Sequence, residues 1–268
     1  MTISRQARYA LLALMGAGLA FIYVPLSVVV INSFNASRTF SWPPSSFTTL
    51  WWSKAIENTG VREALKWSVF AGLTATAIAL FLGTCLAFAV SRYNFFGREV
   101  ISLLVVLPIS LPGVVTGIAL NNAFTKQLGM STGLMTVVIG HATFCIVIVY
   151  NNAIARLRRM GLSLQEASMD LGANGITTFR LITLPNLASA LFAGGLLAFG
   201  LSFDEIVVTT FTAGPGIQTL PIWIFNNLFR PNQAPIVNVV AATLVVLSIA
   251  PIYLSQRLSQ DSTSGGRF

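Results

Sequence analysis

Two neighbouring carboxylates, Asp204 and Glu205, are the residues of this sequence best suited to act on a ligand. They are the only acidic residues inside a long apolar stretch, and a charge at membrane depth is costly enough to suggest a function. One or both could attract a cation; a gate, or an anchor for a loop, is an equally good interpretation. Trp223 and Phe225 lie on a short predicted helix beyond them and could add cation-π contacts, although interfacial packing is the favoured role for both rings.

A helix that continues through the two acids would turn their side chains about 100° apart. Small residues precede each acid at helical spacing. The row before Glu205 is Gly194, Ala198 and Ser202, and the row before Asp204 is Ala193, Leu197 and Gly200. Because such rows allow close packing against a neighbouring helix, we expect both acids to point inward.

The other side chains that commonly carry chemistry are isolated. Cys85 and Cys145 form no C-x-x-C pair, which argues against a disulfide framework or a cysteine metal site. The single histidine, His141, is expected to be a hydrogen-bonded interior residue rather than a proton relay. The sequence contains no HExxH motif, no recognisable Ser/His arrangement and no G-x-x-x-x-G-K-[ST] loop for nucleotide phosphates. It therefore disfavours an intramembrane enzyme and predicts no metal or cofactor bound by this chain.

The composition explains where these residues must lie. Hydrophobic residues make up 54% of the chain and charged residues only 9%, and the mean hydropathy is +0.76. These values are typical of an integral membrane protein. The net charge of +8 comes from basic residues scattered singly between apolar runs. That pattern indicates topology signals and not a nucleic-acid surface.

Six apolar windows are long enough to cross a bilayer as helices, so we predict an all-α protein with six transmembrane helices. The predicted spans are residues 9–34, 64–91, 100–124, 132–153, 186–211 and 236–256. They form one transmembrane domain over residues 1–260, followed by a flexible tail at 261–268. Pro25, Pro108 and Pro112 interrupt two spans. Such breaks often line transport cavities, although tolerated kinks are an equal interpretation.

The basic residues predict the orientation. If the connections alternate between the two sides of the membrane, most of the 16 Lys and Arg residues fall on one side. That side is expected to be the cytoplasm, and both termini face it.

The connection over residues 161–185 is too long and too patterned for a plain turn, and it predicts two short helices. Ser163 and Glu166 have the spacing of a capping box. Gly172 can take the left-handed position that ends the first helix. Asn174 is a good cap for a second helix, which we expect to stop at Leu184-Pro185.

Ala167 and Ser168 suit this helical elbow to docking. They are small residues on the apolar face of its first helix, so a partner surface could approach the backbone closely. An amphipathic loop lying on the bilayer is the alternative interpretation.

The elbow residues resemble the EAA motif found in permease subunits of bacterial ATP-binding-cassette importers. The residues that match it are Glu166, Ala167, Ser168, Gly172, Ile182, Leu184 and Pro185. Only Ser168 departs from the motif, where a second alanine is usual. The likeness extends over almost the whole chain, including HATFCIVIVYNNAIARLRR and LSFDEIVVTTFTAGP, and it is strongest toward importers of the spermidine/putrescine type.

This resemblance implies a fold like that of type I importer permeases, with the elbow between helices four and five coupled to a separate ATPase. It also implies several partners: two ATPase subunits, a second homologous permease, a periplasmic substrate-binding protein and the lipid bilayer of a bacterial inner membrane. ATP would be hydrolysed by the partners. The cargo would be a small cationic amine, with another small amine or an amino acid as the alternative. An ion-coupled secondary carrier is the competing class, but it leaves the elbow unexplained.

Overall fold

The computed structural model describes residues 4–38 and 42–247, and every regular element in this part of the chain is a helix. The protein is therefore an all-α membrane protein, as predicted. The helices are α1 (Arg5–Asn32), α2 (Leu50–Glu57), α3 (Thr59–Arg92), α4 (Arg98–Ser110), α5 (Gly113–Asn122), η1 (Ala123–Gln127), α6 (Leu134–Arg159), α7 (Ser163–Asp170), α8 (Gly175–Thr178), η2 (Phe179–Thr183), α9 (Leu184–Phe203), α10 (Val207–Thr212) and α11 (Leu220–Asn227). A last helix covers Ala234–Leu247.

Among the described residues, four helices are long and apolar enough to cross a membrane: α1, α3, α6 and the continuous helix Gly175–Phe203. A fifth candidate is the pair Arg98–Ser110 and Gly113–Gln127, which is bent by 107°. The sixth predicted span is described only as far as residue 247, and its remainder lies outside the described residues. Six crossings therefore stay a prediction.

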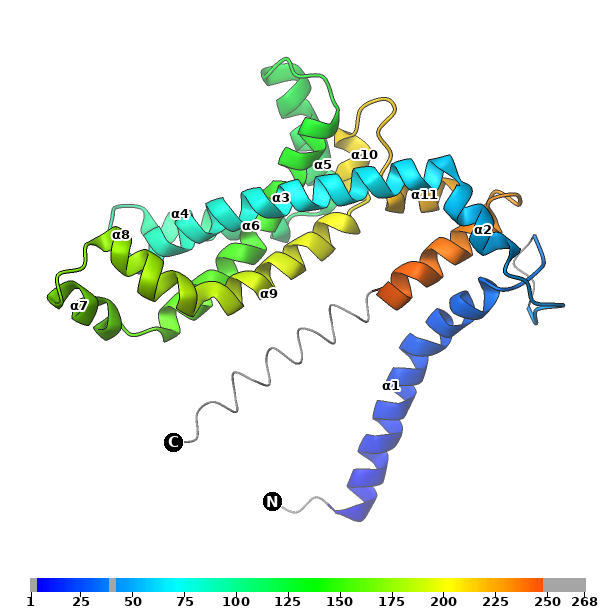
Figure 1. Ribbon diagram of the computed structural model, residues 1–268, viewed down its shortest axis with the longest axis horizontal. Coiled ribbons are helices and arrows are strands. Elements are labelled where there is room, and N and C mark those ends of the chain that lie inside the picture. Colours follow the sequence, from blue (N-terminus) through cyan, green and yellow to red (C-terminus); the bar gives the residue numbers. More distant parts are fainter. Residues whose placement is uncertain (1–3, 39–41, 248–268) are drawn as a thin grey trace. The chain divides into compact units, whose positions relative to one another are not determined.

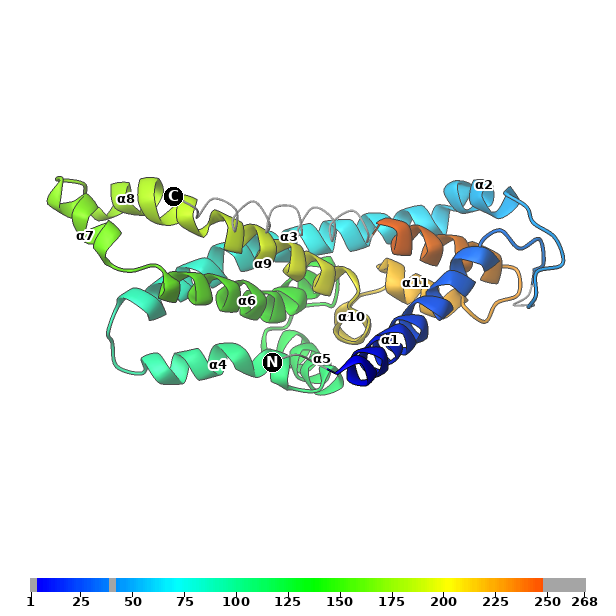
Figure 2. The same cartoon turned by 90° about the horizontal axis from the view of Figure 1, so that it is seen from below.

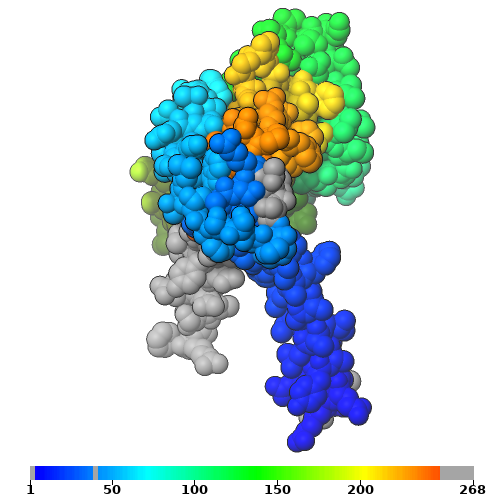
Figure 3. Space-filling model, turned by 90° about the vertical axis from the view of Figure 1, so that its right-hand side faces the viewer, coloured from blue at the N-terminus to red at the C-terminus, as the bar shows by residue number. Residues whose placement is uncertain are grey.

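The described residues fall into two compact units, and each is considered by itself. The smaller unit comprises residues 4–38, 42–62 and 223–247. In it, the Trp51 indole N–H donates to the backbone oxygen of Asn35 at 3.1 Å, which ties α2 to the segment that follows α1. None of the α1 residues from Arg5 to Pro25 is buried (blue in Figure 3).

The larger unit, Glu63–Ile222, is organised around α3, α6 and α9, which run side by side (Figure 1). Small residues on α3 permit the close approach. A Cβ added to Gly83 would lie 3.0 Å from the Ile146 carbonyl oxygen on α6. A Cβ added to Gly194 on α9 would lie 3.2 Å from the Cβ of Asn152. Because membrane helices gain stability from close packing and not from hydrophobicity, these glycines set the spacing of the bundle.

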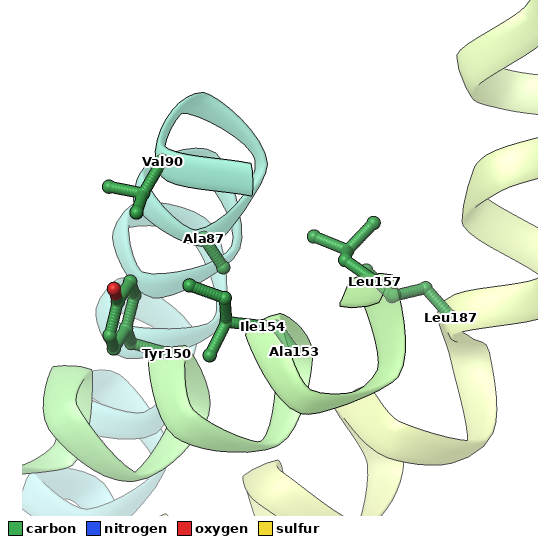
Figure 4. Packing of buried hydrophobic residues seen from close by; sticks show 7 residues of the cluster. All are labelled: Ala87, Val90, Tyr150, Ala153, Ile154, Leu157 and Leu187. Atoms are coloured by element: carbon green, nitrogen blue, oxygen red, sulfur yellow. The ribbon is translucent and has the colours of Figure 1, made fainter. Parts of the chain in front are cut away.

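An apolar cluster joins the three long helices near the ends of α3 and α6 (Figure 4). Its buried members are Ala87, Val90, Tyr150, Ala153, Ile154, Leu157 and Leu187. The Tyr150 hydroxyl also forms a hydrogen bond of 2.9 Å with the Ser102 hydroxyl, which adds α4 to the same assembly; Figure 2 shows α4 alongside α6.

Two predicted spans are broken within the larger unit. The first break separates α4 from α5 at Pro112, which is the N-cap of α5. The second separates α9 from α10 at residues 204–206, inside the span predicted to run unbroken from 186 to 211. The breaks are neighbours, because a Cβ added to Gly113 at the start of α5 would lie 3.4 Å from the Val207 side chain at the start of α10.

Candidate functional site

The turn of the elbow, residues 161–185, is built by local chemistry. Gly172 has a φ of +88°, a left-handed conformation that glycine adopts without strain. The Asn174 Oδ1 accepts a hydrogen bond of 2.9 Å from the Thr177 N–H and caps α8. Both predictions made for these residues are confirmed.

The predicted capping box is wrong. The N-cap of α7 is Leu162 and not Ser163, and it makes no side-chain capping bond. The helix begins one residue earlier than expected because the Glu166 N–H already bonds to the Leu162 oxygen at 2.9 Å. Glu166 therefore lies exposed in the first turn, where the positive end of the helix favours a carboxylate.

The second helix of the elbow does not stop at Leu184-Pro185. It passes through the π-helical turn η2 directly into α9, giving one helix of 29 residues, Gly175–Phe203. Proline is tolerated there because Pro185 lies at the start of the α-helical segment, immediately after the wider π turn. The Asn186 side chain donates to the Ile182 carbonyl at 2.8 Å and satisfies an acceptor in that turn.

Two side-chain hydrogen bonds fasten α7 to this second helix. The buried Gln165 amide donates to the Thr183 hydroxyl at 2.9 Å. The Ser168 and Thr178 hydroxyls are 3.1 Å apart and form the second bond. Ser168 is therefore engaged inside the elbow and is not simply a contact surface for a partner. Sequence reasoning missed Gln165, Thr178 and Thr183, because nothing in their spacing indicates which side chains meet.

Hydrogen bonds between the membrane helices flank the elbow at both ends. The Arg156 Nε near the end of α6 donates to the Asn186 carbonyl at 3.0 Å. At the other end of the elbow, the Arg92 side chain at the end of α3 approaches the Met160 carbonyl at 3.5 Å. These two bonds tie α6 to α9 and α3 to the residue after α6, immediately outside the two ends of the elbow.

The outer surface of the elbow is apolar. Leu171 and Ile176 are 90% and 81% exposed, and Leu164 is also exposed; we call these three residues the elbow tip. Ala167 is exposed on the same helix as Leu164. Of the remaining motif residues, Leu184 and Pro185 are exposed and Ile182 is half-buried. Figure 1 shows α7 and α8 at one end of the larger unit, away from α10.

The two acids lie at the break between α9 and α10 and differ in environment. Asp204 is the exposed C-cap of α9, where the partial negative charge of the helix end disfavours a carboxylate. Its carboxylate makes no hydrogen bond or ion pair with any residue that the structure describes. Glu205 is half-buried, and its Oε1 accepts a hydrogen bond of 2.8 Å from the Val208 N–H in the first turn of α10.

The expectation that both acids point inward holds for only one of them. Gly194, Ala198 and Ser202, the row that precedes Glu205, are buried. The row that precedes Asp204 is exposed at Ala193, Leu197 and Gly200. The difference arises because α6 and α3 pack against α9 elsewhere and leave the side with Ala193, Leu197 and Gly200 exposed.

The exposed side of α9 borders a widely open groove of about 440 Å³, and all of its lining residues belong to the end of this helix and the two residues after it. Its lining residues are Leu196, Leu197, Gly200, Leu201, Asp204 and Glu205. The groove therefore combines an apolar wall with two carboxylates at one end.

His141 is fully buried beside the break, with 0% of its surface exposed. Its Nδ1 lies 2.7 Å from the Ser202 hydroxyl on α9, and its Nε2 lies 2.8 Å from the Thr209 hydroxyl on α10. The prediction of a hydrogen-bonded interior histidine is confirmed. Within the described part of the chain, no group of three or more His, Cys, Asp or Glu residues could hold a metal ion.

Trp223 and Phe225 belong to the smaller unit. Trp223 is buried, and its Nε1 would lie 2.8 Å from a Cβ added to Gly60, so the indole packs against the first turn of α3. Phe225 is exposed. A role for either ring in the pathway stays a prediction.

Comparisons with known proteins agree with this arrangement. Residues 75–263 match a family model described as the binding-protein-dependent transport system inner membrane component. The spermidine/putrescine transport system permease protein PotC of Escherichia coli K12 is 33% identical over 247 residues, covering 92% of each chain. The putrescine permease protein PotI of the same organism is 33% identical and covers 85% of this chain and 83% of its own.

A solved structure is also similar in fold. The crystal structure of a bacterial ABC transporter that imports the acidic polysaccharide alginate contains a chain that aligns with a TM-score of 0.71 at 16% identity. The alignment covers 97% of this chain and 99% of that one.

Proposed function

The chain belongs to the family of inner membrane components of binding-protein-dependent transport systems, and on that premise we propose that it moves a small cationic amine along the groove on α9. A family member of this kind is a transport subunit and not an enzyme. The proposal concerns the cargo, the residues that meet it and the partners that drive the movement.

The carboxylate of Asp204 carries the cargo proposal. It is exposed at the end of α9, and its charge is opposed by the helix end and balanced by no described residue. A cation is the ligand that would relieve this unfavourable arrangement. An ammonium group supplies the charge and can also donate hydrogen bonds to the carboxylate.

The wall of the groove fits the rest of such a cargo. Leu196, Leu197 and Leu201 offer an apolar surface next to the acids, which suits the methylene segments between the amines of putrescine or spermidine. The relatives named above carry these two compounds in their names. We therefore propose a putrescine- or spermidine-like cargo, with its charged end at Asp204.

Uptake of radiolabelled putrescine and spermidine by cells carrying the complete transporter tests the cargo proposal. Asp204→Asn should lower uptake about tenfold or more, because a charge-assisted interaction is lost. Glu63→Gln is the matched control, since Glu63 is an exposed acid in the same unit but outside the groove. Unchanged uptake by Asp204→Asn at normal membrane levels would remove the proposal.

We further propose that the elbow docks on an ATPase subunit, which hydrolyses the ATP. The exposed apolar tip formed by Leu164, Leu171 and Ile176 supports this, as does the small Ala167 beside it. The motif residues Glu166, Gly172, Ile182, Leu184 and Pro185 would shape or border the docking surface. Uptake that persists with a hydrolysis-deficient ATPase would instead favour an ion-coupled carrier.

The proposed assembly contains two ATPase subunits, a second homologous permease and a periplasmic binding protein. The uncovered face of α9 supports a second permease, because another helical subunit there would close the groove into a path. The proposed topology has six spans with both termini in the cytoplasm. Co-purification of the subunits and cysteine labelling of the termini in intact cells would test these points.

A further inference from the structure

We propose that His141 is a positioning residue for transport: with Ser202 and Thr209 it forms a polar bracket that fixes the break after α9 and so holds Asp204 at the groove. The inference rests on the proposed function, in which Asp204 meets the cation. The bracket is named here for the three residues that form it, one each on α6, α9 and α10.

The donor and the acceptor of each hydrogen bond in the bracket can be assigned. The Thr209 hydroxyl donates to the Glu205 carbonyl at 2.7 Å, so its contact with His141 must be one in which Thr209 accepts. The Nε2 of His141 therefore carries the hydrogen. In a neutral imidazole the Nδ1 is then an acceptor, and it receives the Ser202 hydroxyl hydrogen. Every member is satisfied by a single neutral tautomer.

The bracket spans the two sides of the break. Ser202 lies two residues before Asp204, and Thr209 lies five residues after it. Both are tied to one imidazole on α6, which is a continuous helix of 26 residues. Glu205 is held as well, because its carboxylate bonds to Val208 and its carbonyl to Thr209. The break is thereby fastened to α6 on both sides, whereas the exposed Asp204 carboxylate has no hydrogen bond to any described residue.

Burial makes this fastening strong. Exposed fractions of Ser202 and Thr209 are 3% and 0%, and that of His141 is also 0%. A buried polar group that loses its partner pays its full desolvation cost, so opening the bracket would leave several groups unsatisfied together. The bracket therefore keeps the end of α9, the start of α10 and α6 moving as one body during transport.

Four variants of the complete transporter separate positioning from packing. His141→Leu removes both bonds, His141→Gln can still donate to Thr209, and Thr209→Val removes a hydroxyl without changing the shape of the side chain. Cys145→Ala is the matched control. Cys145 is buried one turn further along α6, and its thiol faces the Ala198 carbonyl of α9. If His141→Leu fails to reach the membrane, Thr209→Val carries the same test.

Radiolabelled spermidine uptake, normalised to the amount of permease in the membrane, is the first measurement. We expect His141→Leu and Thr209→Val to lower it about tenfold, His141→Gln to recover most of the loss and Cys145→Ala to stay within about twofold of the parent. Equal losses in Cys145→Ala and His141→Leu, without rescue by glutamine, would overturn the inference.

A double-mutant cycle with Asp204→Asn is the second measurement, because a residue with only a packing role would not pass it. If His141 acts by placing the carboxylate, His141→Leu should add no more than about twofold to the loss caused by Asp204→Asn. Losses that multiply would refute positioning and leave the cargo proposal intact. Full uptake by Asp204→Asn alone would instead refute the cargo proposal, and the positioning role with it.

Discussion

Glu205 caps the first turn of α10 by accepting the Val208 N–H, whereas Asp204 ends α9 with an exposed carboxylate. The dipole of α10 favours an acid at Glu205, before its first turn, and the dipole of α9 disfavours one at Asp204, after its last turn. Each effect is worth about 0.3–1 kcal/mol when the acid is exposed. One acid therefore stabilises the fold, and the other is kept at a cost that a cationic ligand would offset.

This division of roles predicts different responses to substitution. Glu205→Ala should destabilise the permease by about 1 kcal/mol through loss of a helix cap, and a lowered melting temperature of the purified complex would register it. Glu205→Gln keeps an acceptor oxygen and should retain both stability and uptake. A loss of uptake in Glu205→Gln as large as that in Asp204→Asn would show that the carboxylates share one role.

Ala167 is the residue on which docking of the elbow can be tested most directly. Ala167→Trp should lower uptake about tenfold or more, because an overpacked contact costs about 1–3 kcal/mol. ATP hydrolysis should continue without stimulation by the loaded binding protein. Ala167→Ser keeps the side chain small and serves as the control; coupling that survives the tryptophan would contradict docking at this surface.

At the scale of elements, the elbow is a pair of helices joined by two side-chain hydrogen bonds. Its turn could be predicted from sequence because Gly172 and Asn174 act on their own neighbours. The bonds from Gln165 to Thr183 and from Ser168 to Thr178 could not, since they form only after the chain has folded back. The capping box failed for a related reason, because a one-residue shift in the start of α7 changes the role of Ser163.

The hydrogen bond between Gln165 and Thr183 predicts a loss of coupling when it is removed. Gln165→Leu and Thr183→Val should each lower transport about threefold to tenfold, as expected for one buried hydrogen bond. Transport per ATP hydrolysed in reconstituted vesicles is the measurement. Ser163→Ala is the matched control, because Ser163 makes no capping bond; a loss in this variant equal to that in Gln165→Leu would indicate that helix stability alone is responsible.

The membrane helices likewise have some features that local sequence predicts and others that depend on tertiary contacts. Apolar length locates the long helices because a bilayer requires it, and Pro112 marks the bend between α4 and α5. The break at 204–206 contains no proline or glycine from which it could have been predicted. It is supported by Glu205, Thr209 and His141, whose meeting requires α6 to be in place.

At the scale of the larger unit, the elbow and the acidic break lie on the same helix. Gly175–Phe203 has 29 residues, so it extends about 43 Å at 1.5 Å per residue. The two proposed sites, one for the ATPase and one for the cargo, are therefore connected by a single element with no loop between them. Most of this connection was hidden in the sequence, where Leu184-Pro185 suggested a helix end.

The length of the unbroken helix also sets the direction in which the side chains near its end point. One alanine inserted between Leu191 and Phe192 would lengthen it by about 1.5 Å but turn everything beyond by about 100°. Ser202 would then face away from His141, and Asp204 would leave its groove. We expect uptake to fall about tenfold or more in this variant. An alanine inserted after Gly129, in an exposed loop of the same unit, should be tolerated and is the control. The number of residues in this helix therefore fixes which side of the bundle each later side chain faces.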